Sequence, residues 1–160
     1  MTAQSIFDQL CAPFPTEYVK WRVGPTNERS KKPDERLEGE PLAYIDARAV
    51  MDRFDSVLGP ERWQCTYTPG VGASIVCNIG VLIGDEWIWK ADGAGPSDTE
   101  PEKGALSDAF KRAAVRWGVA RYLYDLDVRW VPLDDRKRIT KVTMQWLAEQ
   151  HDKFAKRITA

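Results

Sequence analysis

The fold of this 160-residue chain is decided by the stretch from Glu102 to Leu126, which reads EKGALSDAFKRAAVRWGVARYLYDL. At about 100° per residue, its apolar side chains fall on one face of a helix. Asp108, Lys111 and Arg112 fall on the opposite face. We therefore expect a long helix that packs against the rest of the fold and displays a basic pair. The expected apolar face consists of Leu106, Ala109, Phe110, Ala113, Trp117 and Ala120.

The start of this helix is predicted by a capping box. Thr99 precedes Glu102 by three residues, and Pro101 would lie in the first turn, where its missing N–H has no cost. The preceding segment DGAGPSDTEPE, residues 92–102, is rich in Gly, Pro and acidic residues and is expected to be a loop.

Three strand candidates come before this loop. They read WQCTYT (63–68), SIVCNIGVLI (74–83) and EWIWKA (86–91), and short Gly-containing links separate them. Such links favour an antiparallel meander. Because side chains alternate along a strand, Trp87 and Trp89 should point to the same face.

The remaining segments add smaller elements. We expect a short helix that stops at Pro13, a half-buried strand over residues 17–23, and an exposed loop over residues 24–40. Asp46 should cap a helix that Gly59 closes, and a final helix should begin near Thr140. The sequence thus predicts an α+β fold, with an antiparallel β-meander packed against a long helix and additional short helices, in one domain.

The charge is distributed unevenly along the chain. Residues 1–102 carry 10 Lys and Arg against 17 Asp and Glu, whereas residues 103–160 carry 13 against 7. A basic half within a chain of net charge -1 hints at a polyanionic partner. The alternative is an ordinary solvated helix surface beside an acidic loop.

The cysteines and the hydropathy indicate the cellular compartment. Cys11, Cys65 and Cys77 are odd in number and lack CxxC spacing, and His151 is the single histidine. This composition supports neither a disulfide framework nor a zinc site, and it fits a reduced cytoplasm. No segment reaches the length of a membrane span, so we expect a cytoplasmic protein without a membrane partner.

Residues that could carry catalysis are few. One histidine near the C-terminus does not complete a Ser/His/Asp or Cys/His arrangement, and the Gly-containing loop lacks both common phosphate-binding patterns. A two-metal nuclease remains an alternative, as does a module that binds no DNA. The carboxylates of such a nuclease would be Asp85, Glu86, Asp92, Asp98 and Glu102.

Two segments resemble a known family. They are YIDARAVMDRFDSVLGPERWQ (44–64) and DGAGPSDTEPEKGALSDAFKRAAVRWGVARYLYDLD (92–127), with the strand meander between them. They are similar to the annealing domain of the Rad52 family of recombination proteins, which has phage and bacterial members. The resemblance covers about residues 5–128 of a single annealing domain over 1–160, and the basic segment and helix of 129–160 have no counterpart.

The resemblance implies a non-enzymatic protein of recombinational DNA repair that binds single-stranded DNA, anneals complementary strands and needs no cofactor. It also implies a homo-oligomeric ring and a nucleoid-associated protein of bacterial or phage origin. Binding to double-stranded DNA, to a single-strand-binding protein or to a recombinase stays open, as do the ring size and the role of loop 24–40.

The resemblance also suggests which residues bind DNA. Lys111 and Arg112 fall on the Lys-Arg pair that lines the family's DNA groove. Two further groove arginines of the family would fall on Val115 and Ala49, one residue away from Arg116 and Arg48, and a one-residue shift turns a helical side chain by about 100°. Other candidates rest on charge alone. The full set is Lys111, Arg112, Arg116, Arg48, Lys90, Arg136, Lys137 and Arg138.

Overall fold

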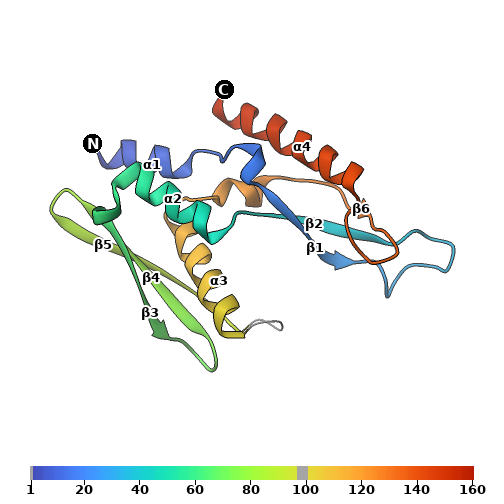
Figure 1. Cartoon of the computed structure of the whole chain (residues 1–160), viewed down its shortest axis with the longest axis horizontal. Coiled ribbons are helices and arrows are strands. Elements are labelled where there is room, and N and C mark those ends of the chain that lie inside the picture. The colour runs from blue at the N-terminus through green and yellow to red at the C-terminus, as the bar shows by residue number, and fades with distance from the viewer. Residues whose placement is uncertain (1, 97–100) are drawn as a thin grey trace. The chain divides into compact units, whose positions relative to one another are not determined.

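A computed structural model describes residues 2–96 and 101–160 and has the expected α+β fold (Figure 1). Within these residues, four α-helices accompany two antiparallel sheets of three strands each. The helices are α1 (Ala3–Cys11), α2 (Ala47–Leu58), α3 (Pro101–Arg116) and α4 (Lys141–Thr159). The strands are β1 (Lys20–Thr26), β2 (Glu38–Tyr44), β3 (Trp63–Pro69), β4 (Ile75–Ile83), β5 (Glu86–Ala94) and β6 (Val131–Pro132).

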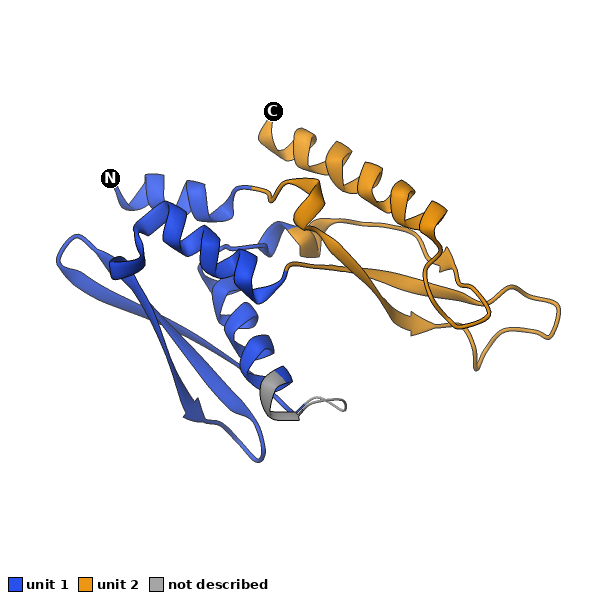
Figure 2. Cartoon of the chain, viewed as in Figure 1, with its two compact units in different colours: residues 1–12, 46–122 blue, residues 13–45, 123–160 orange. Residues whose placement is uncertain are grey.

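The chain divides into two compact units (Figure 2). Unit 1 contains residues 1–12 and 46–122, and unit 2 contains residues 13–45 and 123–160. Each unit has its own three-stranded sheet. A single annealing domain over residues 1–160 stays a prediction.

The sheet of unit 1 is the expected meander, in the order β3-β4-β5. Trp87 and Trp89 lie on the same face of β5, with ring centroids 6.3 Å apart. The strand β5 continues to Ala94, so Asp92 and Gly93 belong to the sheet and the prediction that they start a loop was wrong. The strand persists because both residues are paired with β4, at Cys77 and Val76 respectively.

The helix α3 packs on β4 and β5. Phe110 and Trp117 are almost fully buried. The ring centroid of Phe110 lies 6.4 Å from that of Phe54 on α2. One member of the expected apolar face is wrong, because Leu106 is 37% exposed. The predicted capping box involves Thr99, which lies outside the described residues.

The helix α3 is shorter than the apolar pattern suggested. It ends at Arg116, and a 3-10 turn follows over Arg121–Asp125. Between them, Gly118 and Ala120 have φ angles of 91° and 60°, in the left-handed region that ends a helix. The apolar residues beyond Arg116 therefore pack from a turn.

The sheet of unit 2 has the order β1-β2-β6, and β2 falsifies part of the prediction of a loop over residues 24–40. This strand reads EGEPLAY, and its charged, Gly and Pro residues conceal its pairing with β1. Pro41 is tolerated because β6 pairs only with Glu38 and Gly39, beyond the proline.

The terminal helix α4 begins after Thr140, as predicted, and buries Leu147, His151 and Phe154. His151 is fully buried, and its Nδ1 lies 2.8 Å from the hydroxyl of Thr16. Burial lowers the pKa of His151, because the charged imidazolium loses its hydration inside the protein.

This histidine should make the stability of the protein sensitive to acid. Because the pKa of His151 is lower in the folded chain than in the unfolded chain, its contribution is complete above about pH 6.5 and is lost as the pH falls below that value. We expect the melting temperature to drop more between pH 7 and pH 5 for the wild-type chain than for His151→Gln. Since His151 is the single histidine, parallel curves for the two proteins would contradict this assignment.

Candidate nucleic-acid interface

The residues of the candidate site are positioned by the packing of α3 against the sheet of unit 1. One face of α3 is made of small or aromatic side chains that lie against the strands, and Trp117 donates a hydrogen bond from Nε1 to the carbonyl of Ile79, at 3.1 Å. This bond and the small side chains bring the helix close to the sheet. The buried side chains are Ala105, Ala109, Phe110, Ala113, Ala114 and Trp117.

The strand β5 directs two charged side chains toward α3. Lys90 and Asp92 are paired with Ile79 and Cys77 of β4, both of which are fully buried. Directly paired residues point to the same face of an antiparallel sheet. Lys90 and Asp92 therefore lie on the face that α3 covers.

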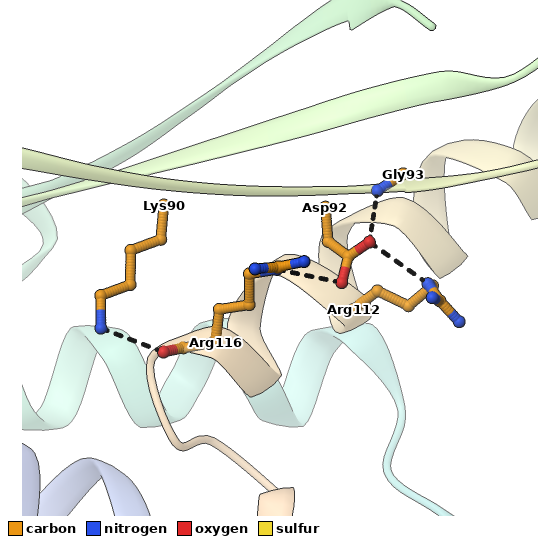
Figure 3. Close-up of polar contacts among 5 residues, drawn as sticks. All are labelled: Lys90, Asp92, Gly93, Arg112 and Arg116. Atoms are coloured by element: carbon orange, nitrogen blue, oxygen red, sulfur yellow. Dashed lines mark hydrogen bonds and ion pairs between the residues drawn. The ribbon is translucent and has the colours of Figure 1, made fainter. Parts of the chain in front are cut away.

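Asp92 lies between two arginines of α3 (Figure 3). Arg116 donates from Nε to Asp92 Oδ2 at 3.2 Å, and Nε of Arg112 lies 3.6 Å from Oδ1. The same Oδ1 accepts a hydrogen bond from the backbone N–H of Gly93, at 2.8 Å. We call Asp92, Gly93, Arg112 and Arg116 the Asp92 cluster.

The carboxyl group of the Asp92 cluster is held in its charged form. Burial opposes the ionisation of Asp92, but the hydrogen bonds from Gly93 and Arg116 and the charge of Arg112 outweigh it. The pKa of Asp92 is therefore below its usual value. Two guanidinium groups around one carboxylate leave one positive charge in excess within the Asp92 cluster.

Lys90 lies at the end of α3. Its Nζ donates to the carbonyl of Arg116 at 3.2 Å and lies 4.6 Å from the ring centroid of Trp117 and 5.5 Å from that of Phe7. A cation suits this place because the C-terminal carbonyls of a helix carry partial negative charge. Lys90 thus has a structural role as a cap of the C-terminal end of α3. Its contact with DNA stays a prediction.

The other predicted residues of unit 1 lie on two helices. Lys111 is half-buried on α3, one residue before Arg112. Arg48 is exposed in the first turn of α2. Arg112 does not project straight away from the sheet, as the helical pattern suggested, because it turns to Asp92 at the side of the helix.

The basic segment Arg136–Arg138 belongs to unit 2, where it forms a turn around Asp134. The backbone N–H groups of Arg136 and Arg138 both donate to Asp134 Oδ1, at 2.9 Å. Nζ of Lys137 lies 2.6 Å from Glu28. All three basic side chains are exposed.

The sequence does not reveal the role of Asp92, which local patterns place in a loop and among the candidate metal ligands. The signal was present, because Lys90 and Asp92 alternate along a strand and Arg112 and Arg116 have the four-residue spacing of one helix face. What the sequence did not show is that these two faces meet.

The other carboxylates proposed for a nuclease do not form a metal site within the described residues. No three His, Cys, Asp or Glu side chains of that part of the chain are gathered as metal ligands would be. Asp98 and the side chain of Glu102 lie outside it. Among the described helices, none combines the length and apolar character needed to cross a membrane.

Comparison with known proteins confirms the family resemblance, and the matches run past residue 128, where the sequence analysis placed the end of the resemblance. The Rad52/22 family of double-strand break repair proteins matches residues 2–142. A single-stranded DNA-binding protein DdrA of Deinococcus radiodurans is 34% identical over 157 residues, which cover 96% of this chain and 72% of that protein. A DdrA of Deinococcus deserti, also called a single-stranded DNA-binding protein, is 38% identical over 143 residues, or 86% of this chain and 66% of the relative. By sequence and over most of its length, this chain belongs to the Rad52/22 family of double-strand break repair proteins.

Proposed function

We propose that this protein binds single-stranded DNA and anneals complementary strands during DNA repair, without a catalytic step. The observation that carries the proposal is the pair of arginines on α3, Arg112 and Arg116, whose side chains are 56% and 58% exposed. They lie in a chain that shares 34% and 38% identity with two single-stranded DNA-binding proteins.

The chemistry required for annealing is electrostatic. Phosphate contacts from Lys and Arg supply most of the affinity of sequence-independent binding, and they reduce the repulsion between two strands. If the backbone is held and the base edges stay free, complementarity is tested by base pairing itself. Sequence preference should therefore be slight.

We assign the main phosphate contacts to Lys111, Arg112 and Arg116 of α3. Their support is the position of this helix in the family resemblance and the exposure of the two arginines. Arg48 is a further candidate because it is exposed on α2. The charge and exposure of the turn Arg136–Arg138 support its three side chains as additional contacts, and Lys90 would contribute from β5.

One assay separates this function from its alternatives. The purified protein is mixed with labelled complementary oligonucleotides, with and without magnesium, and the products are resolved on native and denaturing gels. We expect accelerated annealing in both conditions and intact strands. Magnesium-dependent cutting would identify a nuclease instead, and the absence of both binding and annealing would indicate a module that does not act on DNA.

Self-association is a separate part of the proposal and follows from the family resemblance. We expect the protein to form a homo-oligomeric ring, so that light scattering after size exclusion gives a mass many times the 18.2 kDa of one chain. A monomer at micromolar concentration would contradict the ring while leaving the binding of single strands open to the assay above.

A further inference from the structure

Asp92 contacts both arginines through the nitrogen nearest the side-chain stem. The two ion pairs join Nε of Arg112 and Nε of Arg116 to different oxygens of the carboxylate. An arginine has five N–H donors, of which only one is on Nε. The hydrogen bond from Arg116 to Asp92 likewise uses Nε, at 3.2 Å. Because both arginine side chains are more than half exposed, an outside anion can reach their terminal N–H groups.

The Asp92 carboxylate is held in place by the sheet, between the long side chains of Arg112 and Arg116. Asp92 belongs to β5, which is paired with β4, and the N–H of Gly93 holds Oδ1 at 2.8 Å. The arginines have long side chains four residues apart on α3, where like charges repel and many rotamers are available. An anion held between the two arginines offsets their repulsion and restricts the rotamers that their side chains adopt.

The exposure of the three side chains shows whether Asp92 orients the two arginines or covers them. A carboxylate that blocked the arginines would engage and cover their terminal nitrogens. Instead the Asp92 side chain is 23% exposed, whereas those of Arg112 and Arg116 are 56% and 58% exposed. The anion lies inside the cluster and the cations lie outside it (Figure 3).

We propose that Asp92 is a positioning residue for phosphate binding: it holds Arg112 and Arg116 side by side, with their terminal N–H groups available to the backbone of a DNA strand. This inference rests on the proposed function and adds to it a carboxylate that favours DNA binding. An acidic residue near a DNA-binding surface would ordinarily be expected only to weaken the binding.

Two neutral variants separate the positioning effect from the charge effect. Asp92→Asn and Asp92→Ala both remove the negative charge, which by itself favours a polyanion. Asparagine retains one acceptor oxygen at this place, whereas alanine retains none. Because ordering one long side chain costs about as much as a three- to tenfold change in affinity, Asp92→Ala should bind single strands about three- to tenfold more weakly than Asp92→Asn.

The experiment measures the dissociation constant of a labelled oligo-dT by fluorescence anisotropy. Both Asp92 variants are made in the wild-type chain and in Arg112→Ala/Arg116→Ala. We expect the difference between the two variants in the wild-type chain and equal affinities in the double-alanine background, where no arginine remains to be positioned. Equal affinities in the wild-type chain would overturn the proposal, as would a difference that persists without the arginines.

Two controls keep the result interpretable. Melting temperatures establish that each variant is folded, and if Asp92→Ala is not, Asp92→Ser replaces it. Serine keeps an oxygen near the N–H of Gly93 but is too short to reach the arginines, so it should bind as weakly as expected for alanine. If the wild-type protein does not bind oligo-dT at all, the proposed function fails and the role of Asp92 falls with it.

Discussion

Replacing Lys111 and Arg112 together by alanine is expected to lower the affinity for single-stranded DNA roughly ten- to hundredfold. Each residue should contribute one phosphate contact, and such a contact is worth about 1 kcal/mol or somewhat more. The helix should form as before, because alanine has a higher helix propensity than either residue. The affinity is measured by anisotropy with oligo-dT, and the fold by circular dichroism.

Two matched variants show whether position or total charge matters. Lys153→Ala/Lys156→Ala also removes two positive charges, but from α4, where both side chains are exposed. This variant should change the affinity far less. Lys111→Arg/Arg112→Lys keeps the charges in place and should retain most of the binding. If the α3 and α4 variants lose affinity equally, general charge rather than the α3 surface governs binding.

Loss of α3 folding in the Lys111→Ala/Arg112→Ala variant would have another meaning. Arg112 is paired with Asp92, and a partly exposed ion pair of this kind contributes at most about 1 kcal/mol to stability. An unfolded variant would therefore show that the basic pair is needed for structure, and the assignment of phosphate contacts to it would lose its support.

Replacing Arg53 by methionine is expected to destabilise the protein by about 3 kcal/mol. Nη1 of Arg53 donates to the carbonyls of Gln9, Leu10 and Ala12, at 3.2, 3.2 and 2.6 Å. These carbonyls lie in the last turn of α1 and at its C-cap Ala12, and the carbonyl of Gln9 also accepts a hydrogen bond from the N–H of Ala12, at 3.4 Å. Methionine keeps much of the apolar stem but leaves the carbonyls without the charged donor, and hydrogen bonds to charged groups are the stronger ones.

The free energy of unfolding in urea measures this effect. Arg48→Met on the same helix is the control, because Arg48 is exposed and its loss should change the stability by less than about 0.5 kcal/mol. Burial lowers the pKa of Arg53, but an arginine remains charged at neutral pH, so the effect should not depend on pH between 6 and 8. Equal stabilities of the two variants would contradict a capping role for Arg53.

The parts of the fold with strong periodicity could be predicted from the sequence. The meander of β3, β4 and β5 was predicted because its links are short, and α3 because its buried face repeats with the helical period. The strand β2 could not be predicted, because EGEPLAY carries charged, Gly and Pro residues that are common in loops. The strand is stabilised by pairing with β1, whose residues lie well before it in the sequence.

The candidate site was predictable only in part. The basic residues of α3 were visible in the sequence, but their partner Asp92 is separated from them by some twenty residues and depends on how α3 lies on the sheet. Arg53 is a similar case, because its three acceptors are backbone carbonyls, which carry no sequence signal. Local patterns thus predicted the cations, and only the packed structure showed what holds them.

The salt dependence of single-strand binding tests the central claim most directly. The association constant for oligo-dT is measured at several salt concentrations for the wild-type chain and for Lys111→Ala/Arg112→Ala. Each phosphate contact to a single strand contributes roughly 0.7 to the slope of log K against log salt, so the double variant should have a slope smaller in magnitude by about 1.4. Parallel lines for the two proteins would contradict the claim that Lys111 and Arg112 bind the DNA backbone.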